Sequence, residues 1–379
     1  MAFTLHAPMN ILFINNFRYR GGGEEFLMEL LPGLAKMGAT IGIVCRPDTP
    51  LASMFQNHPV KVYPIEKSGI KGISSFFEIA AIIRHGKYEI VSIQRGHDIV
   101  QAWIATLLSG VPLPLVYTVH IADFIKSQFL LNRLHNIVTI SQYIVKRMEA
   151  FQPTLTGKIK VIHHGIDLDA FKPLPRMPGY IRNLFGLSSD IPLLSTSGSM
   201  WKNQIEFLDA LVEIRKAIPS VRYLLLTPLA DMPQLREFKN RAAALGVTDS
   251  ILWLDALPKG DMPAYYADID VAVSTFRNEG FGIWVIEALA MGTPVVAFDE
   301  GGVRDALEGC PAGILVRDGA HGMAEEIIKI LRNKELRNLM SIAGPRWVAE
   351  RFSRDRMIEE YLRFFADIIK NNSNSTEKD

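Results

Sequence analysis

The segment from Ser274 to Gly302 holds residue types that can bind an anionic ligand. It reads STFRNEGFGIWVIEALAMGTPVVAFDEGG, which predicts a strand, a glycine-bearing loop, a short helix, a second strand and a second glycine loop. Gly280 and Gly282 let backbone N–H groups approach a ligand closely, and the helix expected from Ile283 directs the positive end of its dipole to the same place. A phosphate group fits there.

Two carboxylates flank this loop. Glu279 lies at its rim, and Glu287 lies about one turn into the expected helix, from which its side chain can reach the same ligand. Carboxylates accept hydrogen bonds from hydroxyl groups but repel phosphates. A ligand that suits both halves of the segment therefore carries a diphosphate together with sugar hydroxyls, as a nucleotide sugar does.

The run EGFGIWVIE followed by ALAMGTPVVAFDEGG resembles the donor-binding signature of the family 4 retaining glycosyltransferases, which have the GT-B fold. Two glutamates, four glycines and Pro294 fall in register with it. A plain strand–helix–strand unit, in which Gly292 caps the helix and Pro294 stops it, explains those two residues. It does not explain Glu279 or the E-G-F-G run, so we favour the functional interpretation.

The resemblance implies that this block binds the donor. The backbone amides from Phe281 to Ile283 are expected to contact the diphosphate. Glu279 is expected to bind the hydroxyls of the transferred sugar, and Glu287 those of the ribose. We expect the donor to be a UDP-sugar rather than a GDP-sugar, and we expect no separate cofactor.

A second loop of the same half, SGSMWKNQ, adds a cation. Lys202, which we expect at the start of a helix, matches a family lysine that neutralises the departing diphosphate, with Gly198 and Ser199 also on the donor. The family's usual arginine is missing because Ser199 stands in its place, in a loop that looks about two residues short. Unless stabilisation of the diphosphate is weaker, another arginine replaces it. The candidates are Arg277, Arg18 and Arg20.

The first half has its own glycine loop, NNFRYRGGGEEF, between an expected strand and helix. It is neither a G-x-G-x-x-G fingerprint nor a P-loop, but such a loop can hold a phosphate or a sugar against backbone amides. The family has Gly-Gly here, beneath the transferred sugar and near the acceptor, so the resemblance assigns that role to Gly22 and Gly23. A flexible turn is the simpler alternative.

His120 ends the expected strand PLVYTVH, at the carboxyl edge where α/β proteins bind ligands. In similar enzymes a histidine after this strand contacts the donor sugar and the acceptor in the closed cleft. The resemblance therefore makes His120, with Glu279 and Lys202, a candidate catalytic residue. A lone histidine is otherwise more often a packed or solvated residue.

We expect no metal site. The adjacent His163 and His164, in a segment that resembles the interdomain turn of the family, point to opposite faces if they lie on a strand and cannot easily share one ion. Two D-x-D triplets, at residues 167–169 and 268–270, neighbour neither glycine loop. We interpret their carboxylates as capping or solvated groups.

The order of elements predicts an α/β protein of two similar halves. Short apolar strands alternate with amphipathic helices in both halves, which is typical of parallel sheets. The resemblance implies the GT-B arrangement, two Rossmann-like doubly wound domains that face each other across a cleft. The expected segments are an acceptor-side domain at 1–172, a donor domain at 173–355, a helix returning to the first domain at 356–370 and a disordered tail at 371–379.

Composition fits a globular protein of two domains. The 379 residues are 48% hydrophobic and 21% charged, and the start lacks the features of a secretory signal, so we expect a cytoplasmic protein. Cys45 and Cys310 lie in separate halves and are expected to be buried, without a disulfide or zinc site.

Residues 1–172 hold 17 Lys and Arg against 12 Asp and Glu, and the rest hold 24 against 28. The excess in the first half fits an acidic acceptor or peripheral contact with the anionic inner membrane face, although ordinary surface scatter explains it more simply. No pattern indicates nucleic acid.

These observations favour a retaining, metal-independent glycosyltransferase of the hexosyltransferase type. It would move a sugar from a nucleotide diphosphate to a hydroxyl acceptor, a glycan or lipid-linked, in the synthesis of cell-surface polysaccharide, lipopolysaccharide or glycolipid. The alternatives are a GT-B-fold epimerase or phosphorylase, and a non-catalytic nucleotide-sugar binding protein.

Overall fold

A computed structural model describes residues 9–18, 21–66, 69–121, 126–173, 179–229 and 233–376. The chain divides into two compact units. The first unit contains the chain up to Gly165 and from Arg354 onwards, and the second unit is Ile166–Ser353. Both divisions fall a few residues before the predicted boundaries, and residues 174–178 lie outside the described residues.

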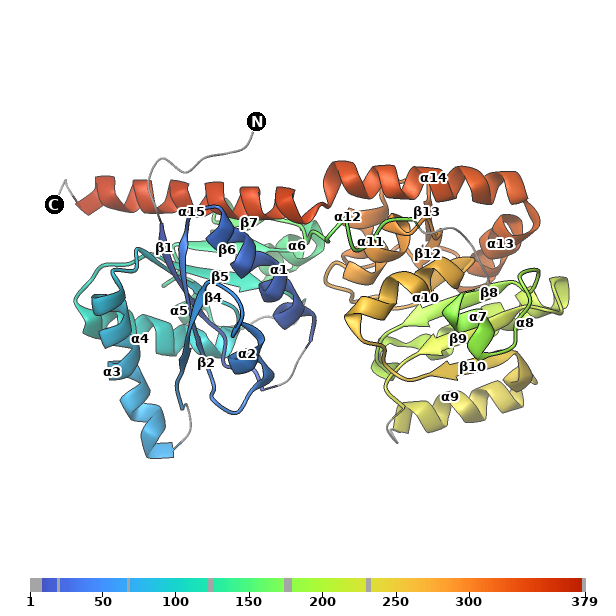
Figure 1. The fold of residues 1–379 in the computed structure, drawn as a ribbon, viewed down its shortest axis with the longest axis horizontal. Helices are drawn as coiled ribbons and strands as arrows, with labels where there is room; N and C mark the ends of the chain where they lie inside the picture. The colour runs from blue at the N-terminus through green and yellow to red at the C-terminus, as the bar shows by residue number, and fades with distance from the viewer. Residues whose placement is uncertain are drawn as a thin grey trace. The chain divides into compact units, whose positions relative to one another are not determined.

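The first unit is built on a seven-stranded parallel sheet with the order β3-β2-β1-β4-β5-β6-β7 (Figure 1). Its central strands are almost wholly apolar and buried, because helices cover both faces of such a sheet. The strands are β1 Asn10–Ile14, β2 Thr40–Cys45, β3 Val60–Pro64, β4 Ile90–Ile93, β5 Leu115–Val119, β6 Asn136–Thr139 and β7 Ile159–Val161.

Helices flank this sheet, and all but the C-terminal helix lie between successive strands of it. They are α1 Gly22–Lys36, α2 Pro50–Met54, α3 Gly69–Gly86, α4 Ile99–Ser109, α5 Gln128–Leu131, α6 Gln142–Phe151 and the C-terminal α15 Arg354–Thr376, with the 3-10 helices η1 Gly96–Asp98 and η2 Pro153–Leu155. The helix α15 is longer at both ends than the predicted 356–370. Residues 371–376, which we expected to be disordered, are its last turns, and 377–379 lie outside the described residues.

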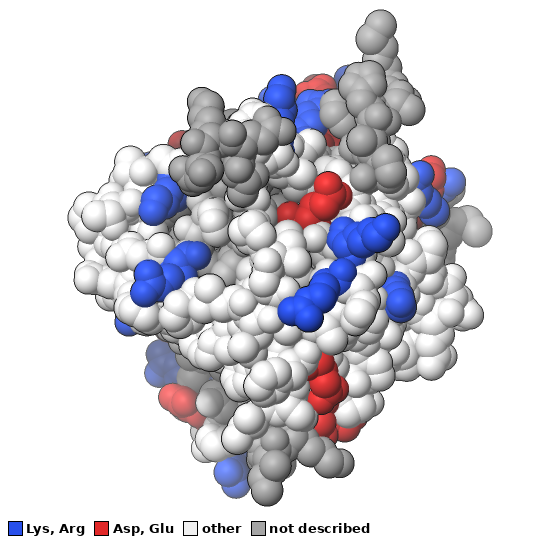
Figure 2. Space-filling model, turned by 90° about the vertical axis from the view of Figure 1, so that its left-hand side faces the viewer, with Lys and Arg blue, Asp and Glu red and all other residues white. Residues whose placement is uncertain are grey.

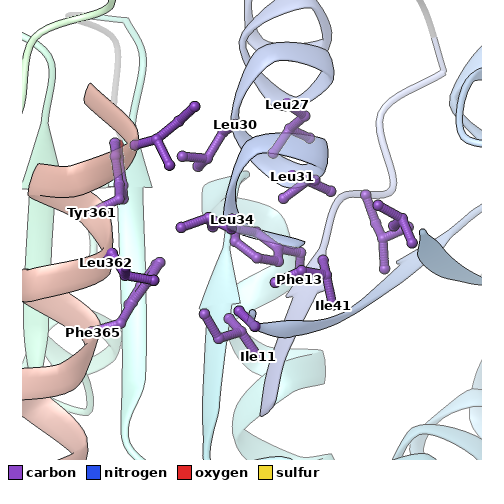
Figure 3. Packing of buried hydrophobic residues seen from close by; sticks show 14 of the residues in the cluster. Ile11, Phe13, Leu27, Leu30, Leu31, Leu34, Ile41, Tyr361, Leu362 and Phe365 are labelled. Atoms are coloured by element: carbon purple, nitrogen blue, oxygen red, sulfur yellow. The ribbon is translucent and has the colours of Figure 1, made fainter. Parts of the chain in front are cut away.

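The helix α15 belongs to the core of the first unit. Its buried face, with Tyr361 and Phe365, packs against α1 and β1, where Phe13 meets Phe365 edge to face at 6.1 Å between ring centroids. Figure 3 shows side chains from these three elements meeting in one apolar layer. Replacing a buried phenylalanine such as Phe365 by alanine typically costs about 3–5 kcal/mol of stability, so α15 is an integral part of this unit.

The second unit repeats the architecture with six parallel strands in the order β10-β9-β8-β11-β12-β13 (Figure 1). The strands are β8 Leu193–Ser197, β9 Arg222–Leu226, β10 Ile251–Leu254, β11 Val271–Ser274, β12 Val295–Phe298 and β13 Gly313–Val316. The helices are α7 Tyr180–Leu184, α8 Phe207–Ala217, α9 Pro233–Ala244, α10 Met262–Asp268, α11 Ile283–Ala290, α12 Val303–Leu307, α13 Gly319–Arg332 and α14 Lys334–Arg351, with η3 Met200–Lys202, η4 Gln204–Glu206, η5 Thr248–Ser250 and η6 Lys259–Asp261.

The strand order reverses direction once in each sheet, at the β1/β4 pair in the first unit and at the β8/β11 pair in the second. Loops that leave the carboxyl ends of such a pair diverge and open a crevice, which is where doubly wound proteins bind ligands. The prediction of two Rossmann-like domains is confirmed, and the two reversals show where each unit can carry a site.

One further expectation concerns the two cysteines. Cys45 and Cys310 are both buried and unpaired, as predicted, and burial raises the pKa of Cys45 to about 12 and that of Cys310 to about 11. Among the described helices, none combines the length and apolar character that crossing a membrane requires.

Candidate functional site

The loop after β8 is held in shape by the loop after β11. Gln204 donates from Nε2 to the carbonyl oxygens of Gly198 at 3.2 Å and Ser199 at 2.8 Å, and Thr275 donates from Oγ1 to the carbonyl of Asn203 at 2.8 Å. Asn203 itself is left-handed, with φ 62°. The Gln204 bonds fix the loop after β8, and the Thr275 bond joins it to the loop after β11 across the reversal point of the sheet, so the two loops form one platform.

Lys202 and Glu279 meet on this platform. The Nζ of Lys202 lies 2.8 Å from Oε2 of Glu279, with 23% and 12% of the two side chains exposed. Lys202 ends η3 rather than beginning α8, which corrects the expected position. Phe276 lies 5.5 Å from the ammonium, and Trp201, which is largely exposed, packs edge to face on Phe276. A charged pair therefore stands at the mouth of the crevice beside an exposed aromatic ring.

Backbone geometry requires glycine at Gly282 and at Gly302. Gly282 has φ 88° and is the N-cap residue of α11, with no side-chain cap, so the first N–H groups of the helix are available to a ligand. Gly302 donates its N–H to the carbonyl of Glu279 at 2.7 Å, and a Cβ at Gly302 would overlap the carbonyl of Gly280. The glycine loop that follows β12 thus packs against the glycine loop that follows β11 and holds its backbone in place.

Glu287 lies in the second turn of α11 and is 8% exposed. Tyr266 donates from its hydroxyl to Oε2 of Glu287 at 3.1 Å. Burial, followed by the nearby Glu287 charge, raises the pKa of Tyr266 well above its usual value, so this tyrosine stays a neutral donor. The carboxylate is therefore oriented by a tertiary contact that the sequence motif did not predict.

Among the candidates to replace the missing arginine, Arg277 is engaged elsewhere. It forms ion pairs with Glu206, at 3.0 Å, and with Glu300, and its guanidinium lies 4.5 Å from the centre of the Phe298 ring. Arg18 belongs to the first unit, and Arg20 lies outside the described residues. Of the residues in the second unit that we predicted to neutralise the diphosphate, Lys202 pairs with Glu279, whereas Arg277 pairs with other glutamates.

The carboxylates of the D-x-D triplets stabilise local backbone. Asp268 accepts hydrogen bonds from the N–H groups of Gly179, Ile181 and Arg182 and so caps α7, while Asp270 pairs with the Arg182 guanidinium at 2.8 Å. Asp167 accepts from the N–H of Asp169 at 2.9 Å. The capping interpretation is confirmed for Asp268 and Asp167, and Asp268 and Asp270 are buried rather than solvated. Within the described ranges, no group of three or more His, Cys, Asp or Glu side chains is arranged to hold a metal ion.

In the first unit, Gly22 and Gly23 lie in the helix rather than before it. Gly21 is the N-cap, α1 begins at Gly22, and a Cβ at Gly23 would meet Arg95 at 3.4 Å and His120 at 3.8 Å. This corrects the expected loop, in which all three glycines preceded the helix. These are ordinary contact distances, and they place the first turn of α1 beside the residues that follow β4 and β5.

His120 follows β5 directly, and its ring is held on several sides. Gln94 donates from Nε2 to Ser92, which leaves its Oε1 to accept from Nε2–H of His120 at 3.0 Å. Nδ1 is buried and makes no hydrogen bond to any described residue. Burial first, then His164 and Arg95, lower the pKa of His120 well below its usual range. The ring is thus a neutral imidazole whose Nδ1 can accept a proton or hydrogen bond.

The structure adds neighbours that the sequence analysis did not single out. Arg95, which follows β4, donates to Oε1 of the buried Glu24 at 2.8 Å and lies 3.8 Å above the Phe17 ring. Asn15, which follows β1, donates to the same carboxylate oxygen at 3.0 Å. The positions of Asn15 and Arg95 just after strands were the signal that could have identified them.

His164 was considered only as a metal ligand, but it packs on His120. The two rings stack at 5.7 Å between centroids with an interplanar angle of 21°, and Phe26 lies 4.9 Å from each. Burial and the neighbouring His163 lower the pKa of His164 to about 3. The pair is therefore two neutral imidazoles clamped by an aromatic ring from α1.

The geometry can be compared with known proteins. Residues 191–347 match the family model described as glycosyl transferases group 1, and residues 20–170 match that of glycosyltransferase family 4. Together the two matches span most of both units.

The curated proteins that align with this chain include the following two. A D-inositol 3-phosphate glycosyltransferase of Xylanimonas cellulosilytica is 26% identical, with 92% of each chain covered. A GDP-mannose-dependent alpha-(1-6)-phosphatidylinositol monomannoside mannosyltransferase of Mycolicibacterium smegmatis is 27% identical over 57% of this chain and 58% of its own. Among solved structures, HepE of Anabaena in complex with UDP and glucose has a TM-score of 0.80 at 20% identity, covering 94% of this chain and 99% of its own.

Proposed function

This chain belongs to the family 4 glycosyltransferases, retaining enzymes of the GT-B fold that use nucleotide sugars, and we propose how its residues bind the donor and acceptor. The second unit binds the donor. The first unit supplies His120 and the first turn of α1 to the acceptor and the transferred sugar. No metal ion takes part.

One observation carries the proposal: Lys202 and Glu279 lie 2.8 Å apart beside the uncapped start of α11. A diphosphate bound by the amides of Phe281 to Ile283 lies within a helix dipole that favours negative charge. Lys202 turns from Glu279 to the diphosphate, and Glu279 is released to the hydroxyls of the sugar. The backbone of Gly198 and Ser199 completes the diphosphate site.

Glu287 binds the ribose hydroxyls. The hydrogen bond from Tyr266 orients this buried carboxylate, and a carboxylate has about four acceptor sites in total, which suits it to bind ribose hydroxyls. Hydrogen bonds to a charged acceptor are stronger than neutral ones, so the bond to each hydroxyl contributes more than an ordinary one.

In the first unit, His120 accepts a hydrogen bond at Nδ1 from a hydroxyl of the transferred sugar or the acceptor. Its Nε2–H is already used by Gln94, and its lowered pKa keeps Nδ1 unprotonated at neutral pH. Gly22 and Gly23 leave space above the first turn of α1 for the sugar.

The reaction proceeds with attack on the same face of the sugar that the diphosphate leaves. The bond from the anomeric carbon to the acceptor oxygen forms as the bond to the phosphate oxygen breaks, and a phosphate oxygen takes the acceptor proton. Stabilising the departing diphosphate by Lys202 and the α11 amides supplies most of the catalysis.

For the donor we propose a UDP-sugar. HepE of Anabaena was crystallised with UDP and glucose, whereas the Mycolicibacterium smegmatis relative is GDP-mannose-dependent. For the acceptor we propose a hydroxyl of a lipid-linked saccharide, in line with the phosphatidylinositol monomannoside named for that relative. We also propose that the protein works in the cytoplasm in peripheral contact with the inner membrane face.

Calorimetry against UDP-, GDP- and ADP-sugars tests the donor, and Lys202→Met tests the site. Loss of a charge-assisted contact of about 1.5–3 kcal/mol lowers affinity for the preferred nucleotide diphosphate by about 10- to 100-fold. Lys216→Met, an exposed lysine on α8, is the matched control and should bind normally. Unchanged affinity in Lys202→Met would remove Lys202 from the diphosphate site.

A further inference from the structure

The helix α4 presents its apolar side to the solvent. Its outer stripe of Val100, Trp103, Ile104, Leu107 and Leu108 has the spacing of one helix face. Its buried side consists mainly of small or polar residues, which are Gln101, Ala102, Ala105, Thr106 and Ser109, with Ile99. A helix that packs only against its own sheet has the reverse distribution, so the outer stripe is not explained by the fold.

The neighbouring helices extend this stripe into one surface. Ser75 of α3 accepts a hydrogen bond from Gln101 of α4 at 2.7 Å, and Arg84 of α3 donates to the carbonyl of Ser109 at 2.9 Å, so α3 lies along the whole length of α4. On the other side, Trp103 meets Phe129 of α5 edge to face at 5.9 Å. We call this surface the α3–α5 face. Its exposed large apolar residues are Ile73, Phe77, Val100, Leu107, Leu108 and Phe129.

These side chains are exposed to an unusual degree for their size. Phe77 is 61% exposed, Leu107 63% and Phe129 56%. Single exposed apolar residues are normal on any protein, but a contiguous group on adjacent helices marks an interaction surface. A binding partner must therefore be largely apolar where it meets these residues.

The charges around the face are mostly positive. Among the described side chains from residue 72 to residue 135, the exposed basic ones are Arg84, Lys87, Lys126 and Arg133, and Glu78 is the exposed acidic one. Figure 2 shows this side of the molecule as largely uncharged, with Lys and Arg spread over it and Asp and Glu in fewer places. The surface thus combines apolar side chains with more exposed basic side chains than acidic ones.

An apolar groove lies at one end of the face. It has a volume of about 370 Å³ between the end of α4 and the segment before β6, and Trp103, Leu107 and Leu113 are among its walls. Arg133 also lines the groove, and its guanidinium lies over the rings of Trp103 and Phe129 at 5.0 and 4.5 Å. A hydrocarbon segment fits the walls, and an anionic group fits the arginine.

We propose that the α3–α5 face docks on the surface of an anionic phospholipid bilayer. Apolar side chains enter the boundary between headgroups and acyl chains, and the surrounding lysines and arginines attract the negative headgroups. The inference rests on the proposed lipid-linked acceptor for its purpose, since an enzyme held at the membrane meets such an acceptor there. It specifies the surface that makes the contact and the lipid charge that it selects.

Flotation of the full-length protein with vesicles tests this, without nucleotide sugar or acceptor. Vesicles of phosphatidylcholine with phosphatidylglycerol should bind the protein, and vesicles of phosphatidylcholine alone should bind it at least about tenfold more weakly, because each lysine near an anionic surface contributes about 1 kcal/mol. Because no transfer is measured, a failure here is distinct from a failure of the proposed chemistry.

The apolar contribution is tested by the double variant Phe77→Ser with Leu107→Ser. It should lower vesicle binding at least about tenfold, since two large side chains no longer leave water. The matched control is Leu339→Ser with Ile342→Ser on α14 of the second unit, at 61% and 54% exposure, which should bind vesicles as the unaltered protein does. Donor affinity and melting temperature should stay unchanged in both, because these residues are exposed and outside the proposed donor site.

The charge contribution is tested by Lys87→Gln with Lys126→Gln, against Lys216→Gln with Lys334→Gln on the second unit. The first pair should weaken binding to anionic vesicles about tenfold or more, and the second pair should not. The proposal is overturned if the protein does not bind anionic vesicles, or if it binds neutral vesicles as strongly as anionic ones. It is likewise overturned if the variants of the α3–α5 face bind vesicles as strongly as their control variants do. It is also overturned if sedimentation shows that the unaltered chain is a dimer and that the double variant Phe77→Ser with Leu107→Ser is a monomer, because the face would then be a contact between two copies of this chain.

Discussion

The two units share one topology but create different electrostatic environments at their strand-order reversals. In the first unit, Glu24 is 1% exposed where it pairs with Arg95, and the neighbouring His120 is kept neutral. In the second unit, the Lys202 and Glu279 side chains are 23% and 12% exposed, beside glycine loops and an uncapped helix start. In the first environment a buried ion pair stands beside a neutral imidazole, and in the second the ion pair itself is more exposed to solvent.

The difference follows from what surrounds each reversal point. Aromatic rings and α1 enclose His120, and removing water penalises the protonated form of an imidazole. Around Lys202 the loops are short and rich in glycine, so solvent and a ligand can reach the charges. The same fold can therefore supply proton-accepting chemistry in one half and anion binding in the other.

The largest expected effect comes from His120→Ala. Transfer should slow by about 10²-fold or more, because the variant lacks the neutral acceptor at Nδ1, while affinity for free nucleotide diphosphate, which we assign to the second unit, stays nearly unchanged. Initial rates with an identified acceptor and calorimetry with the nucleotide diphosphate measure the two quantities.

The matched control is His85→Ala, an exposed histidine on α3, which should behave as the unaltered protein does. Normal turnover in His120→Ala would make His120 a packing residue. A parallel loss of nucleotide affinity would break the assignment of separate roles to the two units.

Glu287→Ala should have the next largest effect, on binding rather than on folding. Affinity for the nucleotide diphosphate should fall by about 1–3 kcal/mol, since charge-assisted hydrogen bonds to the ribose are removed. Calorimetry measures it, and Glu325→Ala, an exposed glutamate on α13, is the control. Undiminished affinity in Glu287→Ala refutes the ribose role. Tyr266→Phe sharpens the test, because it removes the hydroxyl that orients the carboxylate and should weaken binding less.

A smaller effect concerns pH and the enclosed environment of the first unit. The pKa of His164 is about 3 in the folded protein, below the value of about 6.5 in an unfolded chain. Above pH 6.5 both states are neutral and the contribution to stability is complete. As pH falls from about 6.5 to about 3, only the unfolded state takes up the proton, so stability is lost at roughly 1 kcal/mol per pH unit.

Urea unfolding between pH 7.5 and 4.5 measures this loss. His164→Asn should flatten the dependence, whereas His85→Asn should leave it as it is. An unchanged slope in His164→Asn would mean that water reaches the ring and that the first unit is less enclosed than its packing indicates.

The smallest expected effect is that of excess EDTA. Turnover should not change, because Lys202 and the α11 dipole carry the charge of the diphosphate while Asp167 and Asp268 are used by backbone N–H groups. Loss of turnover that manganese or magnesium restores would contradict this and show that the second unit needs additional positive charge.

Much of the candidate donor site in the second unit could be predicted from its sequence motif. The Gly280–Gly282 loop, the helix from Ile283 and the position of Glu287 within it follow from local sequence, since glycine and helix signals act over a few residues. The Lys202–Glu279 contact could not be predicted from the sequence, because it joins two loops that are far apart in the chain and that only the folded sheet brings together. The ion pairs of Arg277 with two glutamates could not be predicted from the sequence either, because both glutamates lie in other loops.

In the first unit, less of the candidate site could be predicted from the sequence. His120, Gly22 and Gly23 were candidates from the sequence, whereas Arg95, Glu24 and His164 were not assigned a place in the site. The extent of α15 was also misjudged, since the polar run NNSNST is typical of a disordered tail, whereas the helix that precedes it, anchored by Tyr361 and Phe365, continues to Thr376.

By itself the sequence determined the parallel sheets, the donor motif and the family, because strand and helix periodicity and a dense local motif are written in neighbouring residues. Only the tertiary structure decided which charges meet, which histidines stay neutral and which apolar stripe of α4 remains uncovered. Those properties depend on burial and on contacts between distant segments. A sequence lists the groups, but the sheet that brings strand ends together sets their distances and their access to water.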